Sequence, residues 1–245
     1  MQPVKPYSAE GSKKEQVAQM FNAISKRYDV LNRTLSMGID VLWRKKTVRS
    51  VRKSGALDIL DVATGTADLA IALHSGIPGS RVQGVDISAG MLEVGREKIT
   101  RRGLDPHIPL HLGDGESLPF EAASFDAVTV AFGVRNFEHL EKGLQDMGRV
   151  LRPGGCLAVL EFSQPEAFPF RQLYFFYFKH ILPTIGRWVS KDSAAYTYLP
   201  ASVEAFPYGQ AFAAKLRDAG FEHIAIQPLT FGIASLYLAY TPKQA

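Results

Sequence analysis

The residues with the clearest chemical potential lie in the stretch Ile59 to Leu73, ILDVATGTADLAIAL. It begins as an apolar run that holds one acid, Asp61, breaks at Thr64-Gly65-Thr66, and resumes with a helical Ala/Leu/Ile pattern. A strand followed by a tight glycine turn and a helix aims backbone N–H groups and a helix N-terminus at a ligand. The stretch therefore predicts a ligand site at the turn, although any βα turn of an α/β protein shares this pattern.

A second acid, Asp86, ends the next apolar run and lies 21 residues after Gly65. An acid at this place accepts hydrogen bonds from both ribose hydroxyls of a nucleotide, so we expect an adenosine-containing ligand. A dinucleotide site requires G-x-G-x-x-G, because the pyrophosphate must touch the backbone. Here the three positions hold Ala63, Gly65 and Asp68. The missing glycines and the added negative charge favour a cationic ligand without phosphate over NAD.

The elements that must position these residues alternate between short apolar strands and helices from Leu57 onward. This alternation predicts an α/β fold with a mostly parallel, doubly wound sheet and helices on both faces. The expected strands are residues 59–64, 81–86, 109–113, 125–132, 156–162, 223–229 and 233–240. Pro153-Gly154-Gly155 predicts a turn before the fifth strand.

The pattern along the chain predicts a single domain over residues 1–245. Its expected parts are an N-terminal helical region (13–51), a cofactor-binding core (52–163), an aromatic-rich cap insertion (164–207), and a last helix with strands (208–245). The helical patterns of the first part cover residues 13–28 and 41–51. The aromatic residues of the cap either pack on the sheet or line an apolar substrate cleft.

Composition restricts the class of protein further. The 245 residues are 46% hydrophobic and 21% charged, with a net charge of +4 and a single cysteine, Cys156, which excludes an internal disulfide and fits a reducing cytosol. No dense basic stripe with interleaved aromatics points to nucleic acid, and the six histidines show no metal-ligand spacing. The basic run Val41 to Val51 is either a solvated helix face or a membrane-surface patch. Without a signal-type or membrane-spanning run, we expect a cytoplasmic protein, at most peripheral to a membrane.

Four motifs in order resemble the S-adenosylmethionine-dependent methyltransferases of Rossmann-like (class I) fold: the Asp61 to Ala67 turn, Asp86, Asp114, and RVLRPGG at 149–155. A narrower resemblance covers nearly the whole chain. MFNAISKRYDVLNRTLSMGIDVLWRKK, LGDGESLPF, AFGVRNF, LEFSQP and KDSAAYTYLPASVEAFP are similar to the menaquinone and ubiquinone biosynthesis C-methyltransferase family. The N-terminal block is closer to the menaquinone-type members. The chain departs from the usual patterns by holding Ala63 and Ala67 in place of glycine, and Ala131 in place of a polar residue.

This resemblance implies S-adenosylmethionine as the methyl donor, no metal, and a seven-stranded sheet with a helical cap. The implied cofactor residues are Asp61, Gly65, Thr66, Asp86, Asp114 and Gly115. The implied acceptor is a ring carbon of demethylmenaquinol, with menaquinol as the product. The expected partners are this polyprenylated quinol, a transiently contacted membrane surface on the inner face of the cytoplasmic membrane, and a second copy in a homodimer, with no nucleic acid.

Methylation of a quinol ring requires a group that guides the hydroxyl proton and a group that stabilises phenolate charge. Arg135 and Asn136 follow the fourth expected strand, at the sheet edge where ligands bind. Because guanidinium stays protonated, we expect Arg135 to stabilise the developing oxyanion and Asn136 to orient the ring. The alternative is that Arg135 pairs with a carboxylate such as Glu138. Asp192 and Tyr196, in the cap, are candidate base or orienting groups.

Three other functions stay open on the sequence alone. The first is C-methylation of a 2-methoxy-6-polyprenyl-benzoquinol in ubiquinone biosynthesis. The second is a non-catalytic quinone-binding subunit that keeps the cofactor pocket for structure. The third is an NAD-dependent oxidoreductase.

Overall fold

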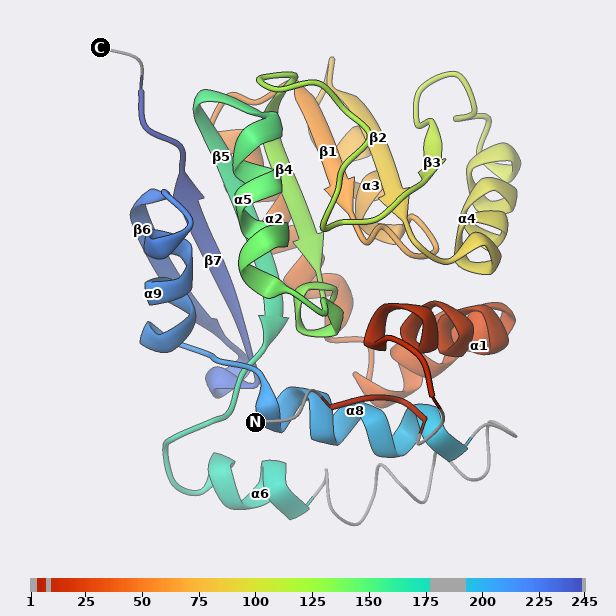
Figure 1. Cartoon of the computed structure of the whole chain (residues 1–245), viewed down its shortest axis with the longest axis vertical. Coiled ribbons are helices and arrows are strands. Elements are labelled where there is room, and N and C mark those ends of the chain that lie inside the picture. The colour runs from red at the N-terminus through yellow and green to blue at the C-terminus, as the bar shows by residue number, and fades with distance from the viewer. Residues whose placement is uncertain (1–3, 8–9, 177–192, 244–245) are drawn as a thin grey trace.

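The computed structural model describes residues 4–7, 10–176 and 193–243, and its centre is a seven-stranded sheet of order β3-β2-β1-β4-β5-β7-β6 (Figure 1). The strands are β1 (Asp58–Val62), β2 (Arg81–Asp86), β3 (Leu110–Leu112), β4 (Phe125–Ala131), β5 (Leu151–Phe162), β6 (Glu222–Leu229) and β7 (Ala234–Tyr240). Strands β1 to β5 are parallel, and β7 runs antiparallel to β5 and β6. The predicted mostly parallel sheet of seven strands is confirmed.

Helices cover both faces of the sheet because neighbouring residues of each buried strand point to opposite sides. Ile59 packs into one core cluster with α2 (Asp40–Lys53) and α3 (Asp68–Gly76). Its neighbour Leu60 packs into a second cluster with α5 (Leu140–Val150) and α9 (Gln210–Asp218). Helix α4 (Ala89–Arg101) adds Ile99 to the first cluster. Two apolar layers therefore hold the sheet rigidly behind its carboxyl edge.

The Pro153-Gly154-Gly155 segment is part of β5, so the predicted turn before the strand is wrong. Phe125 pairs with Leu151, and the next pair joins Ala127 to Cys156, which leaves extra β5 residues in a bulge. Gly154 has φ +75°, a left-handed conformation that glycine adopts without steric cost. The glycines thus bend a continuous strand, and a bulge and a turn share the same local sequence signal.

Three helices lie beyond the carboxyl ends of the parallel strands: α1 (Lys13–Leu35), α6 (Phe170–Phe176) and α8 (Ser193–Ala205) (Figure 1). Helix α1 begins at Ser12, whose side chain forms a reciprocal capping box with Glu15. It continues seven residues past the predicted end at Tyr28. The helices α6 and α8 confirm the helical cap, and together with α1 they cover the sheet edge where a ligand would bind.

Within the described residues, none of the helices is both long and apolar enough to span a bilayer.

Candidate active site

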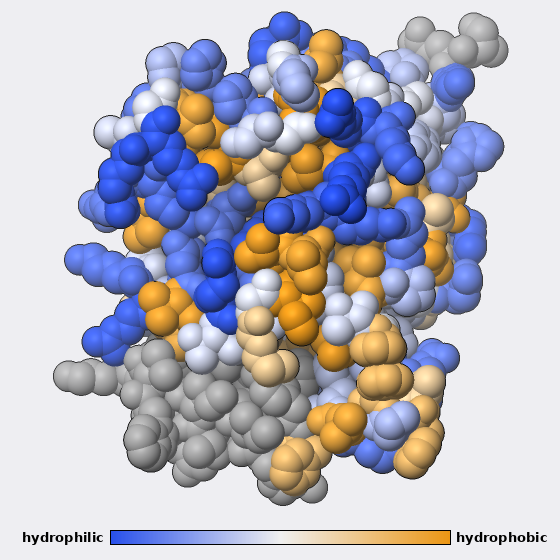
Figure 2. Space-filling view, turned by 180° about the vertical axis from the view of Figure 1, so that it is seen from behind, coloured by the Kyte–Doolittle hydropathy of each residue, from blue (hydrophilic) through white to orange (hydrophobic). Residues whose placement is uncertain are grey.

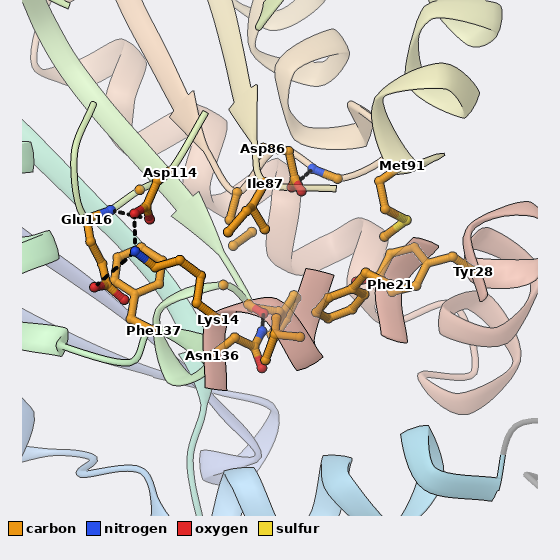
Figure 3. Close-up of a pocket in the computed structure, with 17 residues that line it drawn as sticks. Lys14, Phe21, Tyr28, Asp86, Ile87, Met91, Asp114, Glu116, Asn136 and Phe137 are labelled. Carbon is orange, nitrogen blue, oxygen red and sulfur yellow. Dashed lines mark hydrogen bonds and ion pairs between the residues drawn. The ribbon is translucent and has the colours of Figure 1, made fainter. Parts of the chain in front are cut away.

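A cavity opens at the carboxyl edge of the sheet, between β1 and β4, where the strand order reverses (Figure 3). Ligands of open α/β sheets bind at this switch point. The cavity holds about 650 Å³, including the open space at its mouth. It is lined from the loops after β1, β2 and β4, from the 114–116 turn, and from α1. The lining residues are Lys14, Val17, Phe21, Tyr28, Ala63, Gly65, Asp86, Ile87, Met91, Asp114, Gly115, Glu116, Ala131, Phe132, Gly133, Asn136 and Phe137.

Asp86 lies in the middle of this lining, at the end of β2. Its Oδ2 accepts the N–H of Gly65 at 2.8 Å, and its Oδ1 accepts the N–H of Ser88 at 2.8 Å. Burial raises the pKa of Asp86 to about 6, and the backbone donors oppose the rise. Gly65 stands at φ +56°, which turns its N–H toward the acid. The turn and the acid predicted as one site are therefore in direct contact.

Asp61 lies behind the cavity and is outside its lining. It is 1% exposed, and its two oxygens accept the hydroxyls of Thr129 (2.6 Å) and Thr64 (2.7 Å). Burial raises the pKa of Asp61 to about 6, against the effect of these two hydroxyls. Through its hydrogen bond with Thr64, the carboxylate holds the turn that carries Gly65 in position.

Thr66 is also outside the lining. Its hydroxyl donates to Oδ1 of Asp29 at 2.5 Å and accepts from Nζ of Lys98 at 2.9 Å. Lys98 also pairs with Asp68 at 2.6 Å. Asp68 is thus neutralised locally, and its pKa is lowered despite burial because of Lys98 and other cations. The negative charge that the sequence predicted at this turn is largely compensated by α4.

Asp114 faces the cavity from the turn after β3 and forms an ion pair with Lys14 of α1. Its other oxygen accepts the N–H of Glu116 at 2.9 Å. Glu116 is buried, and its Oε2 lies 3.9 Å from Nζ of Lys14 (Figure 3). The side-chain hydrogen bond to Asp114 is the main reason why the pKa of Lys14 is raised. Neither Lys14 nor Glu116 was predicted as a site residue.

Further hydrogen bonds connect helix α1 to the loops around the site. Oδ1 of Asn22 accepts the hydroxyl of Ser88 (2.7 Å) and the N–H of Gly90 (2.8 Å). The Lys13 ammonium is buried and donates to the carbonyl oxygens of Arg135 (3.0 Å) and Phe137 (2.8 Å). Burial lowers the pKa of Lys13 to about 8. The helix therefore connects the cofactor turns with the loop that carries Arg135.

The loop after β4 forms the short helix η1 (Val134–Asn136). It approaches the turn after β1 so closely that a Cβ on Gly133 would lie 2.6 Å from that of Ala63. Asn136 lines the cavity, and its Oδ1 is buried without a hydrogen-bond partner among the described residues. The structure thus brings Asn136 together with the cofactor turns, as expected.

Arg135 pairs with Glu161 of β5, through Nη1 and Oε1 at 2.8 Å. The alternative that Arg135 pairs with a carboxylate is confirmed, but the partner is Glu161. Glu138 is the wrong partner, since its Oε1 accepts the N–H of Lys13. The guanidinium also lies 5.3 Å from the ring centre of Phe162. Its Nε is buried and has no hydrogen-bond partner in the described part of the chain. Arg135 is therefore held in place by its Nη1 contacts, lies outside the lining of the cavity, and keeps an unpaired Nε donor.

The cap candidates fall at the edge of what the structure describes. Asp192 and the side chain of Tyr196 lie outside the described residues. Two residues further along α8, Tyr198 is buried, and burial raises its pKa to about 12, although Arg135 opposes this. Its hydroxyl has no hydrogen-bond partner among the described residues. Tyr198 was not predicted as a site residue, because burial cannot be inferred from the sequence of an aromatic-rich segment.

The charge and shape of the lining determine which ligand fits. Three carboxylates (Asp86, Asp114 and Glu116) face the cavity with the single ammonium of Lys14. Aromatic rings from α1 and from the loop after β4 complete the walls. Acidic and aromatic groups favour a cation and disfavour a pyrophosphate. The lining therefore fits an adenosyl sulfonium better than a dinucleotide. Among the described residues, no group of three or more His, Cys, Asp or Glu is arranged to hold a metal ion.

The sheet order and the switch-point cavity define a Rossmann-like α/β fold with a ligand site beside the acid after β2. A solved S-adenosylmethionine-dependent methyltransferase from Aquifex aeolicus has this fold, with a TM-score of 0.54 and 18% identity over 75% of this chain and 81% of that one. The family model described as the ubiE/COQ5 methyltransferase family matches residues 9–241. The chain belongs to this family, which confirms the predicted resemblance and the prediction of a methyltransferase.

The chain is similar to named members of this family over nearly its whole length. The chain is 47% identical to a demethylmenaquinone methyltransferase of Bacteroides fragilis, over 96% of both chains. It is 43% identical to a ubiquinone/menaquinone biosynthesis C-methyltransferase of Geotalea daltonii, over 92% of this chain and 96% of that one.

Proposed function

We propose that the protein transfers the methyl group of S-adenosylmethionine to a ring carbon of demethylmenaquinol, giving menaquinol and S-adenosylhomocysteine. The relatives of nearly equal length that carry the demethylmenaquinone name support this acceptor. The methyl donor supplies an electrophilic carbon when it is bound. The protein therefore has to place the acceptor carbon in line with that methyl group and to keep water out.

The observation that carries the proposal is a pair of buried, unpartnered polar atoms on adjacent residues. Nε of Arg135 is a donor and Oδ1 of Asn136 is an acceptor, and neither has a partner within the described residues. Unsatisfied buried groups are costly, so such groups usually have a functional reason. A hydroquinol ring offers a matching pair: an oxygen that accepts and a hydroxyl that donates.

In this proposal, Arg135 and Asn136 have different roles toward the acceptor. The ring carbon becomes nucleophilic as an adjacent hydroxyl gives up its proton, and negative charge grows on that oxygen. The Arg135 guanidinium stabilises this charge, because Glu161 and the carbonyl of Phe132 hold it in place. Asn136 orients the ring by accepting the other hydroxyl. Asp192 and Tyr196 stay candidates for guiding the proton.

Asp86, Gly65, Asp114 and Gly115 form the cofactor site in this proposal. Asp86 accepts the ribose hydroxyls, and the Asp114-Gly115 turn contacts the adenine. Asp61 and Thr66 act one layer behind them, by holding the turn after β1 and by joining it to α1 and α4.

We further propose that the quinol carries a polyprenyl tail along the cap, and that the protein works at the inner face of the cytoplasmic membrane. A tail of this kind partitions into lipid, so the acceptor has to be collected from a bilayer. A homodimer stays a prediction.

Mass spectrometry of quinones from cells that lack the protein tests the acceptor. We expect demethylmenaquinone to accumulate and to disappear when the gene is restored. The benzoquinol acceptor is the second candidate, because the Geotalea daltonii relative is named for both quinones. Accumulation of a 2-methoxy-6-polyprenyl-benzoquinone would favour that candidate, and unchanged quinones would contradict both.

A further inference from the structure

Helix α6 turns apolar side chains outward. Phe168, just before it, is 81% exposed, and Leu173 and Phe176 are 60% and 57% exposed, whereas Tyr174 is buried. Figure 2 shows hydrophobic side chains gathered at the lower right of that face, where α6 lies. Single exposed apolar residues are ordinary, but a cluster of large ones marks an interaction surface.

The short helix η3 (Thr230–Gly232) adds a fourth large side chain to this cluster. Phe231 is 65% exposed, and its ring stacks on that of Phe170 in α6, with 3.8 Å between centroids and 5° between planes. Phe231 has φ +58°, in the left-handed region that bulky residues avoid. A phenylalanine that is both exposed and strained contributes little to folding stability. Its position therefore needs another explanation.

The cluster continues into the basic helix α2. Nε1 of Trp43 donates to the hydroxyl of Thr230 at 2.8 Å, which joins the first turn of α2 to η3. Beside Trp43, Leu42 is 62% exposed. The outward side of α2 then carries the exposed cations Lys45, Lys46 and Arg49. The helix that is bonded to η3 therefore also carries exposed positive charges.

We infer that this surface, made of Leu42, Phe168, Leu173, Phe176 and Phe231 with the α2 cations, docks the protein on an anionic phospholipid bilayer. The occupant follows from the combination of groups. Aromatic and aliphatic side chains enter the boundary between headgroups and acyl chains, and nearby Lys and Arg attract anionic lipids. A two-fold contact with a second copy would set the cations of the two copies near one another. The inference rests on the proposed function, since a polyprenyl acceptor has to be drawn from lipid.

The part of the docking surface on α6 lies on the same side of the molecule as the cavity, whereas α2 packs along a face of the sheet. Helices α1, α6 and α8 all stand beyond the carboxyl ends of the strands (Figure 1). The guanidinium of Arg135 contacts Phe162 near the end of β5, and the ring of Phe162 in turn packs against Trp43 at 6.2 Å between centroids. Trp43, which is bonded to Thr230 of η3, is therefore linked to Arg135 through packed side chains.

Sedimentation of the full chain with vesicles tests the inference. The vesicles are pure phosphatidylcholine or phosphatidylcholine with about a third phosphatidylglycerol. We expect strong binding to the anionic vesicles only. Leu173→Ser with Phe176→Ser, and separately Lys45→Glu with Lys46→Glu, should each weaken the partition coefficient about tenfold or more. Matched controls on other surfaces, the exposed Leu112→Ser and Lys142→Glu with Arg217→Glu, should change it less than twofold.

Binding of S-adenosylhomocysteine to each variant, measured by calorimetry, shows that the fold is intact. The inference would be overturned if the wild-type protein did not bind the anionic vesicles. It would also be overturned if the surface variants and the controls lost vesicle binding to the same extent. A dimer in analytical ultracentrifugation that the Leu173→Ser/Phe176→Ser variant dissociates, without vesicle binding, would assign the surface to a second copy and overturn the inference too. If the wild-type protein binds anionic vesicles but does not methylate demethylmenaquinol, the result would support the inference and contradict the proposed function.

Discussion

Nη1 of Arg135 lies 2.8 Å from Oε1 of Glu161, and the two side chains are 7% and 0% exposed. This pair joins η1 to the end of β5 inside the protein. The pKa of Glu161 is raised by burial, and the charge of Arg135 offsets part of this rise. A buried ion pair adds little net stability, but the loss of one partner leaves an uncompensated charge. The pair therefore fixes the guanidinium between η1 and β5, and a change of either residue leaves the other charge buried and unpaired.

The first prediction concerns this pair. Arg135→Met should lower the free energy of unfolding by about 3–5 kcal/mol, because Glu161 is left buried and unpaired. The double change Arg135→Met/Glu161→Leu should recover most of this loss, since both charges are removed. Urea unfolding of the single and double variants measures the coupling. Losses that simply add would show that the two groups do not depend on each other.

The same double variant separates folding from catalysis. If Arg135 stabilises the phenolate, the refolded double variant should bind S-adenosylhomocysteine within about twofold of wild type and still methylate far more slowly, by roughly a hundredfold for a lost oxyanion contact. Near-normal turnover in this variant would leave Arg135 with a structural role alone.

The second prediction is a pH dependence from Asp61, whose folded pKa of about 6 exceeds the ordinary value of about 3.9. Between pH 4 and 6 the folded protein binds more protons than the unfolded chain. The Asp61 contribution to stability is therefore fully present below pH 4 and is lost as pH rises through 6. In Asp61→Asn this contribution is absent. Wild type should lose about 2 kcal/mol relative to the variant between pH 4.5 and 7.5.

Urea unfolding of wild type and Asp61→Asn at both pH values measures this change in relative stability. Asp126→Asn is a control for which the stability should change with pH in the opposite direction. Burial alone would raise the pKa of Asp126, but the N–H of Asp58, the Arg152 guanidinium and the N–H of Leu57 bring it below its usual value. Its contribution should therefore be lost as pH falls. Parallel stability profiles for wild type and Asp61→Asn would contradict the assignment.

The third prediction concerns ligand binding by Asp86. Ribose hydroxyls need an acceptor, and the pKa of about 6 means that the carboxylate is protonated progressively below this pH. Affinity for S-adenosylhomocysteine should fall about tenfold between pH 7.5 and 5. Asp86→Asn should bind weakly at both values, with the slope removed. Calorimetry across this range is the measurement, and a flat profile in wild type would place the ribose elsewhere.

The fourth prediction uses the charge difference between substrate and product. Lys14 is the only cation facing the cavity among the described residues, opposite three carboxylates. Lys14→Met should favour the cationic S-adenosylmethionine over the neutral S-adenosylhomocysteine by about 1 kcal/mol, or several-fold in the ratio of dissociation constants. Lys26→Met, an exposed change on the same helix, should leave the ratio unchanged. An equal ratio in both variants would show that Lys14 does not set the potential of the site.

The sequence predicted the parts of the site that depend on local pattern. The Gly65 turn and Asp86 are recognisable because a strand, a turn and an acid at the end of the next strand follow from chain geometry. Their direct hydrogen bond of 2.8 Å confirms that this spacing brings the turn and the acid together. The left-handed φ of Ala63 and Ala67, at +51° and +63°, likewise explains why glycine is usual at these positions.

The rest of the site depends on contacts that no local pattern encodes. Lys14 and Asp114 are 100 residues apart in the chain, and Arg135 and Glu161 are 26 apart on different elements. Only the packing of α1 over the sheet, and of η1 against β5, brings them together. The bulge at the glycine-rich start of β5 could not be predicted for a related reason, since pairing with β4 decides whether such a segment bends or turns.

Transfer of an isotope-labelled methyl group by the purified protein tests the proposed function most directly. The protein is supplied with S-adenosylmethionine labelled in the methyl group and with demethylmenaquinol or 2-methoxy-6-polyprenyl-benzoquinol, each chemically reduced and held in detergent. Mass spectrometry should find the label in the ring methyl of menaquinol, with one S-adenosylhomocysteine for each transfer. Label in the benzoquinol product alone, or no transfer by protein that still binds S-adenosylhomocysteine, would contradict it.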